Sequence, residues 1–214
     1  SDLGTGVIKE YRRQGVIKNI LTDIKELIKE KNVKEYILEV IKSNESAVNL
    51  YKNQNFKIQR ELECFKINKS QYNFRIDHKV EQVNDLDLNQ LTRFWDFNPW
   101  WQNSIDSVNA VSDSFLYSIV RCDGTIVGYG IIDKETGDIL QIAVDENFRS
   151  RGVATSLLSD LIKNTESSNI TMLNIGSRMK PMLDFLTKLG FKNYVTQYEM
   201  ILYLNFNKVV DFLL

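Results

Sequence analysis

The chain has 214 residues, enough for one large domain or two small ones. Lys and Arg (27) nearly balance Asp and Glu (28), and the net charge of −1 argues against a general nucleic-acid-binding protein. Apolar residues make up 43% and charged residues 26%, which is typical of a soluble globular protein. No apolar run is long enough to span a membrane, and no signal peptide opens the sequence.

The residues that most often bind metals or act as nucleophiles are few. Cys64 and Cys122 are far apart in sequence, so we expect buried free thiols and a cytoplasmic location rather than a disulfide. His78 is the only histidine. These residues cannot build a common zinc site, so no metal is expected, and a Ser-His-Asp hydrolase is also disfavoured.

The first 69 residues predict two helices, each followed by a strand. Apolar residues at helical spacing between Ile17 and Ile28 indicate an amphipathic helix. Short apolar runs at 36–41 and 62–67 read as buried strands, with a second helix between them. The polar stretch 69–73 then marks a boundary.

Residues 74–144 predict a longer series of elements. The turn Asp123-Gly124 is a strong signal for a hairpin between two apolar strands. Asn84 or Asp85 is expected to begin the first helix. In chain order, the expected elements are a strand at 74–83, helices at 86–94 and 105–111, the hairpin strands 114–121 and 126–133, and a strand at 139–144.

The remaining residues repeat the pattern of the first 69. A helix beginning at Val153 is followed by a strand at 170–175, a second helix and a strand at 199–204. The alternation of helices and strands predicts an α/β architecture. The first copy lacks the opening elements of the second, and the chain begins with Ser1, so we expect a truncated N-terminus.

The two copies share a motif as well as an order of elements. Residues 7–16 align without a gap on residues 144–153, with Val, an aromatic residue, Arg, Gly and Val coinciding. In the second copy the motif lies between a strand end and a helix start. Backbone N–H groups at a helix N-terminus, a glycine that admits close approach and two nearby arginines suit a diphosphate. A simple strand-to-helix turn with solvated arginines is the alternative.

Arg149-x-x-Gly152-x-Ala154 resembles the Arg/Gln-x-x-Gly-x-Gly/Ala signature of the GNAT acetyltransferase superfamily, whose members bind acetyl-CoA. Residues 141–145 are similar to that family's fourth strand, and Gly190-Phe191 to the close after its fourth helix. The resemblance implies an acyl-CoA N-acyltransferase fold, α/β (α+β by some schemes), with a mixed central sheet flanked by helices. It also implies a tandem protein: residues 1–69 form the C-terminal half of a first unit, and residues 70–214 a complete second domain.

The resemblance assigns roles to the second copy. The backbone of Ile142, Ala143 and Val144 would pair with the pantetheine arm, and the Val144 N–H is the candidate donor to the thioester oxygen. The diphosphate would lie in the turn and at the helix start, formed by Arg149, Ser150, Arg151, Gly152, Val153, Ala154 and Thr155.

The first copy carries a different part of the family pattern. There Ile17 replaces the last small residue of the signature. Asn44 and Tyr51 match family positions that contact the cofactor and protonate the leaving thiolate. A helix N-cap and an amphipathic core residue are the respective alternatives.

The second copy has Met179 and Leu186 at the positions of Asn44 and Tyr51, so it lacks the matching acid. Tyr194, Tyr198 or water could protonate the sulfur instead. Asp133, Asp138 and Glu146 could relay a proton, and no general base is identified. The three tryptophans within 94–102 could wall an amine site or pack in the core.

The sequence therefore predicts direct acetyl transfer from acetyl-CoA, as co-substrate, to an unknown amine acceptor. No nucleic-acid or membrane partner is expected. The alternative function is a non-catalytic CoA-binding sensor or interaction module on the same fold. Because the first copy lacks its opening strands, its apolar faces should pack on the second copy or form a homodimer.

Overall fold

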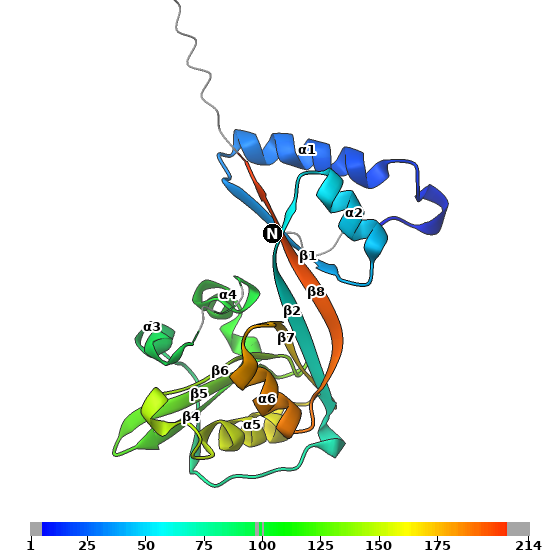
Figure 1. Cartoon of the computed structure of the whole chain (residues 1–214). Helices are drawn as coiled ribbons and strands as arrows, with labels where there is room; N and C mark the ends of the chain where they lie inside the picture. The colour runs from blue at the N-terminus through cyan, green and yellow to red at the C-terminus, as the bar shows by residue number, and fades with distance from the viewer. Residues whose placement is uncertain (1–5, 97–98, 100, 205–214) are drawn as a thin grey trace, which may run out of the picture. The chain divides into compact units, whose positions relative to one another are not determined.

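The computed structural model describes residues 6–96, 99 and 101–204. The fold is mixed α/β, with sheets flanked by helices (Figure 1). In chain order the elements are α1 Val16–Glu30, β1 Glu35–Ile41, α2 Glu45–Asn53, β2 Lys57–Asn68, β3 Val80–Val83, α3 Leu88–Leu91, α4 Ile105–Ala110, β4 Phe115–Cys122, β5 Thr125–Asp133, β6 Ile139–Val144, α5 Val153–Asn164, β7 Asn169–Gly176, α6 Lys180–Lys188 and β8 Lys192–Tyr203. Short 3-10 helices include η3 Thr92–Phe94, η4 Trp101–Asn103 and η6 Glu146–Phe148.

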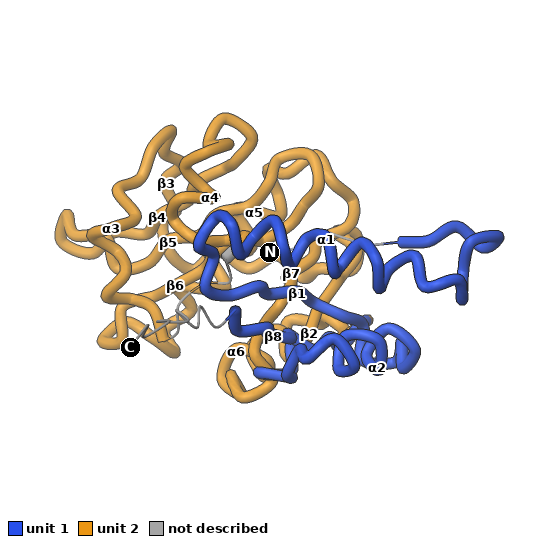
Figure 2. Tube along the Cα trace, turned by 90° about the horizontal axis from the view of Figure 1, so that it is seen from above, with its two compact units in different colours: residues 1–62, 195–214 blue, residues 63–194 orange. Residues whose placement is uncertain are grey.

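The chain divides into two compact units whose limits differ from those of the sequence repeats. Unit 1 comprises residues 1–62 and 195–214, and unit 2 comprises residues 63–194 (Figure 2). The strands β2 and β8 each run from one unit into the other. Unit 2 is thus continuous in sequence, whereas unit 1 is completed by the end of the chain.

Two four-stranded sheets show how the repeats are combined. One has the order β3-β4-β5-β6, and the other has the order β1-β8-β2-β7. In the second sheet β1, from the first repeat, pairs antiparallel with β8, from the second, and β2 lies beside β7. Each repeat therefore gives its last strand to the other, an exchange that the order of elements does not predict.

In unit 2 the helix α5 packs against the antiparallel sheet β3–β6. Leu157 and Leu161 are fully buried on the inner face of α5. They face Gly128 and Gly130 of β5: a Cβ at either glycine would lie within 3.2 Å of the methyl carbon of the facing leucine. Glycine on the strand thus lets the helix approach the sheet closely. The predicted hairpin is confirmed, with Asp123 and Gly124 both at positive φ.

In unit 1 the helix α1 has the same apolar pattern as α5, but fewer of its apolar residues are buried. Among the described residues of α1, Leu21 alone is buried. Ile20, which aligns with Leu157, is 40% exposed, and Leu27 is 53% exposed. The part of the chain that the structure describes contains no sheet in unit 1 corresponding to β3–β6.

The backbone itself repeats at the aligned turns. Arg13 and Gly15 have φ of 62° and 77°, and the aligned Ser150 and Gly152 have φ of 58° and 85°. The two copies therefore share an unusual local conformation as well as a sequence motif.

Three expectations about elements are wrong. Residues 74–79 form no strand: the N–H groups of Arg75, Asp77 and His78 bond to the hydroxyls of Ser159 and Ser156 on α5. The first helix of unit 2 begins after Asp87, which caps α3, and not after Asn84 or Asp85. The final strands β2 and β8 are also longer than predicted, with 12 residues each.

The two cysteines are thiols and are not joined in a disulfide, as predicted. Cys64 is buried, as expected, whereas Cys122 at the end of β4 is only half-buried. In the described part of the chain, no helix is long and apolar enough to cross a membrane.

Among the described residues of unit 1, one carboxylate is buried within the sheet. Glu199 on β8 is 2% exposed and accepts a hydrogen bond from Arg60 Nε on β2. Glu39 on β1 lies directly opposite Glu199 in the strand register. Burial raises the pKa of the Glu199 carboxyl above its ordinary 4.5, and the Arg60 hydrogen bond acts in the opposite direction.

The Glu199→Gln variant is expected to gain stability relative to the wild type as pH rises. A carboxyl whose pKa is raised on folding contributes stability below its unfolded value, and that contribution is lost as pH rises through the raised value. Urea unfolding of both proteins from about pH 4 to about pH 8 measures the difference. A stability difference independent of pH would contradict this account of Glu199.

Candidate functional site

A cavity of about 1280 Å³ lies within unit 2, where β6 and β7 separate. The two strands belong to different sheets, and a parallel bridge joins Asp138, directly before β6, to Thr171 of β7. Beyond this bridge the strands line opposite walls of the cavity, with residues 140–144 on one side and 172–175 on the other. Parted parallel strands leave room for an extended ligand between them.

One wall of the cavity is formed by β6, the last strand of the sheet β3-β4-β5-β6, whose outer edge pairs with no described strand of that sheet. Asp145 N donates to Val127 O of β5 at 2.9 Å. Alternate residues of an antiparallel strand turn their backbone groups to the same neighbour, so Ile142 and Val144 direct their N–H groups away from β5. Their N–H groups therefore face the side on which the cavity lies.

The glycine turn closes one end of the cavity. Gly152 precedes α5 at φ 85°, and no described side chain caps this helix. By contrast, Asn44, Asp87 and Ser104 cap α2, α3 and α4. The first backbone N–H groups of α5 have no partner within the helix, and its dipole favours an anion there. This end of the cavity suits a diphosphate.

The charged side chains around the cavity include more bases than acids. Arg75 pairs with Asp77 at 2.7 Å, and Arg149 pairs with Asp96 at 2.8 Å. Within the described residues, the remaining cationic side chains on the wall form no ion pair; they are Arg151, Lys180 and Lys188. The net positive charge also favours a polyanionic ligand.

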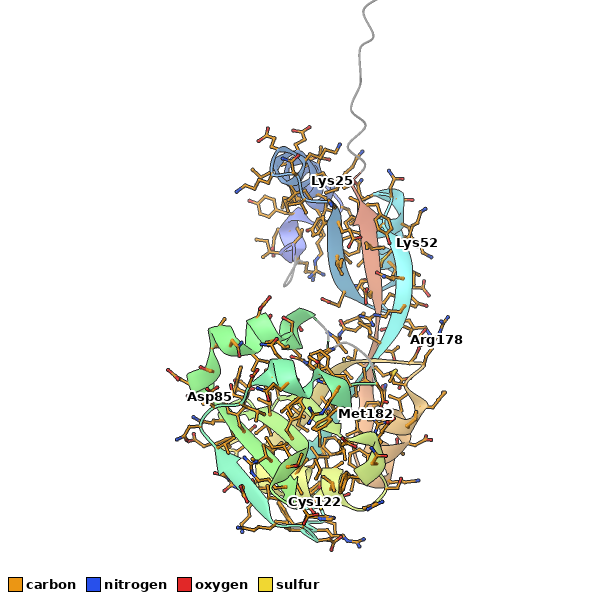
Figure 3. The ribbon with its side chains drawn as sticks, turned by 90° about the vertical axis from the view of Figure 1, so that its left-hand side faces the viewer. Lys25, Lys52, Asp85, Cys122, Arg178 and Met182 are labelled. Atoms are coloured by element: carbon orange, nitrogen blue, oxygen red, sulfur yellow. The ribbon has the colours of Figure 1, made fainter. Side chains whose placement is uncertain are left out.

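Several apolar side chains from α6 and β7 also line the cavity. Met179, Met182 and Phe185 come from the start and inner face of α6, and Met172 comes from β7. Figure 3 labels Met182. Methionine side chains adjust to irregular ligands, so this wall suits a flexible chain. The spacing of three residues along α6 could have indicated this face from the sequence.

A chain of hydrogen bonds links four residues that line the cavity. Trp95 Nε1 donates to Tyr129 Oη at 2.5 Å, and Tyr129 Oη donates to Gln141 Oε1 at 2.7 Å. Gln141 Nε2 in turn donates to Asn103 O at 2.6 Å. Burial raises the pKa of Tyr129 to about 12, with the Trp95 hydrogen bond opposing the shift. Tyr129 therefore remains protonated at neutral pH.

The structure brings together ten of the residues singled out from the second repeat. All of them line the cavity: Ile142, Ala143, Val144, Arg149, Ser150, Arg151, Gly152, Val153, Ala154 and Thr155. The sequence did not indicate Asp77, whose carboxylate lies 3.3 Å from the position of a Cβ at Gly152. Its segment is held by Ser156 and Ser159, two buried serines on an otherwise apolar helix face.

The two candidates from the first repeat lie elsewhere, in unit 1. Asn44 caps α2 by accepting a hydrogen bond from Ala47 N at 3.2 Å, the alternative left open above. Tyr51 is buried, and its ring meets Phe56 edge-on at 5.7 Å. Of the other tyrosines considered, Tyr198 belongs to unit 1, and Tyr194 does not line the cavity.

The carboxylates considered as proton relays also lie outside the cavity wall. The acidic residues that line it are Asp77, Asp96 and Asp184, and not Asp133, Asp138 or Glu146. Within the aromatic segment, Trp95 and Pro99 line the cavity, whereas Phe97, Asn98 and Trp100 lie outside the described residues. In the described part of the chain, no three His, Cys, Asp or Glu residues gather closely enough to hold a metal ion.

Comparison with protein families gives one match, to a model described as the acetyltransferase (GNAT) family. It covers residues 3–56 and 80–191, which is more than half of the chain. A comparison with curated proteins gave no significant match.

Several solved structures share the fold at low sequence identity. A GCN5-related N-acetyltransferase from Sphaerobacter thermophilus is 15% identical, with a TM-score of 0.66; the match covers 92% of this chain and 70% of that one. A tandem GNAT protein from the clavulanic acid biosynthesis pathway is 11% identical, with a TM-score of 0.68; the match covers 92% of this chain and 73% of that one. A GCN5-related N-acetyltransferase from Kribbella flavida is 12% identical, with a TM-score of 0.61; the match covers 84% of this chain and 72% of that one. At such identities the similarity shows the fold alone.

Proposed function

Because the chain belongs to the acetyltransferase (GNAT) family, we propose that unit 2 transfers an acetyl group from acetyl-CoA directly to an amine. The observation that carries this proposal is the cavity between β6 and β7, closed at one end by an uncapped helix N-terminus. The helix N-terminus offers an anion site for the diphosphate of CoA. The edge of β6 in the same cavity offers backbone groups for the amides of CoA.

In this proposal the chain holds and orients the two reactants. The N–H groups of Ser150 to Thr155 would bind the diphosphate, with Arg151 adding charge. The outward N–H of Ile142 would bond the pantetheine arm. The Val144 N–H would donate to the thioester oxygen, where negative charge develops.

The reaction then needs no covalent enzyme intermediate. The neutral amine nitrogen attacks the thioester carbonyl carbon, and the C–S bond breaks as the amide C–N bond forms. The amine loses a proton, and the leaving thiolate of CoA takes up one. Orientation of the two reactants and removal from bulk water supply the rate enhancement.

One observation favours a second function, a CoA-binding module without catalysis. Leu186, which aligns with Tyr51, is fully buried and cannot donate a proton. Tyr129, the tyrosine on the described cavity wall, already donates its proton to Gln141. A screen of amine acceptors that detects thiol release from acetyl-CoA separates the two functions, because a binding module releases none.

Binding of CoA is expected to raise the melting temperature of the chain. Ligand at ~100 times its dissociation constant adds about 2.7 kcal/mol to the stability of the state that binds it. For a protein of this size that corresponds to roughly 5–10 °C. Thermal unfolding at increasing CoA measures the shift, and no shift at millimolar CoA would count against both functions.

The same proposal extends to the organisation of the chain. Residues 1–69 would correspond to the C-terminal half of one GNAT unit and residues 70–214 to a complete second one. The matching backbone angles at Gly15 and Gly152 and the two separate segments matched by the family model support this tandem relationship. The exposed apolar face of α1, whose counterpart on α5 is covered by a sheet, is consistent with it.

A further inference from the structure

The side chain of Arg149 is engaged within the protein. Its Nε donates to Val144 O at 3.0 Å, one terminal nitrogen pairs with Asp96 at 2.8 Å, and the other donates to Phe94 O at 3.2 Å. Three partners on three sides use the planar fork of the guanidinium, which a lysine could not reproduce. The first arginine of the glycine turn therefore ties the end of β6 to residues 94–96.

Residues 94–96 have a second anchor that does not involve the turn. Trp95 donates to Tyr129, which donates to Gln141, which donates to Asn103 O. The direction of this chain is fixed, because an indole N–H can only donate and a carbonyl oxygen can only accept. The network thus holds both ends of segment 94–103 on β5 and β6, independently of any ligand.

Arg149 is by contrast part of the turn itself. It directly precedes Ser150 at φ 58°, and Gly152 follows at φ 85°. An anion that binds the N–H groups of this turn acts on the backbone next to Arg149. Any adjustment there is carried by the guanidinium to Asp96 and to the Phe94 carbonyl.

We propose that Arg149 is a positioning residue that couples CoA binding at the glycine turn to residues 94–96, which also line the cavity. The inference rests on the proposed binding of CoA by unit 2. It assigns the guanidinium of Arg149 to this coupling and leaves Arg151 as the arginine that contacts phosphate.

Tryptophan fluorescence can test the coupling without knowledge of the acceptor. All three tryptophans of the chain lie between Trp95 and Trp101, so the emission reports on this segment alone. Calorimetry measures CoA binding separately. In the wild type, saturation with CoA is expected to change the tryptophan emission.

The variants Arg149→Gln and Arg151→Gln form a matched pair. Arg149→Gln, compared with the wild type when both are saturated with CoA, is expected to lose most of the emission change. Arg151→Gln is expected to bind CoA at least ~10-fold more weakly, through the loss of a charged hydrogen bond, and to keep the full change at saturation. Asp96→Ala removes one of the two contacts that form this link and should also reduce the emission change, although Arg149 still donates to Phe94 O. A reduced change in both variants would argue against a folding defect peculiar to Arg149→Gln.

Three results would overturn the proposal. A full emission change in both Arg149→Gln and Asp96→Ala at saturating CoA would show that another path connects the turn to residues 94–96. An unchanged emission in the wild type when calorimetry detects binding would show that no coupling exists. Absence of any heat of CoA binding in the wild type would overturn the proposed function itself, and the inference with it.

Discussion

Calorimetry of the Gly152→Val variant is expected to show no CoA binding at concentrations that saturate the wild type. Gly152 has φ 85°, and a Cβ there would lie 3.3 Å from the Asp77 carboxylate. A branched side chain would fill the space before the first N–H groups of α5 and force the turn out of its conformation. Loss of two charged hydrogen bonds alone would weaken binding by at least ~100-fold.

Gly15→Val is the matched control for this experiment. Gly15 has φ 77°, and a Cβ there would meet nothing within 4 Å. Both variants therefore carry a similar backbone strain, about 1–2 kcal/mol, but only the substitution at Gly152 alters the cavity. If instead Gly15→Val removes CoA binding and Gly152→Val retains it, the site lies at the first turn, and Tyr51 becomes the best candidate acid.

Leu157→Ala is expected to lower the free energy of unfolding of unit 2 by about 2–5 kcal/mol. Leu157 is fully buried, and its methyl carbon lies against Gly128 of β5. Neither the helix backbone nor the glycine strand can collapse easily to fill the space left. Urea denaturation followed by circular dichroism measures the change.

Ile20→Ala tests the aligned position on α1. Because Ile20 is 40% exposed, its removal should cost less than about 1 kcal/mol. An equal loss at both positions would show that the outer face of α1 is covered in solution, for example in a homodimer, and light scattering would then reveal the association.

The sequence carried enough information to predict the glycine turn. A single Gly-containing motif is weak, but its recurrence before two amphipathic helices restricts both copies to one conformation. The structure shows that conformation twice, with left-handed residues at 13 and 15 and again at 150 and 152. Local chemistry suffices here, since the turn depends on residues that are adjacent in the chain.

Features that depend on distant partners were less predictable. Residues 74–77 alternate apolar and polar residues as a strand would. The N–H groups of Arg75, Asp77 and His78 nevertheless bond to two serine hydroxyls of α5. A period of two describes an extended backbone and does not identify what accepts its hydrogen bonds. For the same reason the repeat predicted β1, β2, β7 and β8 without predicting that the last strands are exchanged.

The exchange of the last strands affects the order in which the two units can fold during translation. Leu38 of β1 pairs with Met200 of β8, so the β1–β8 ladder of unit 1 cannot form until the residues of β8 have been translated. At roughly 5–20 residues per second, β1 waits on the order of 10 s for this partner. Unit 2, being continuous from residue 63 to residue 194, has all of its residues before then. The unit that contains the cavity can thus fold first, while the β1–β8 ladder of unit 1 is completed later.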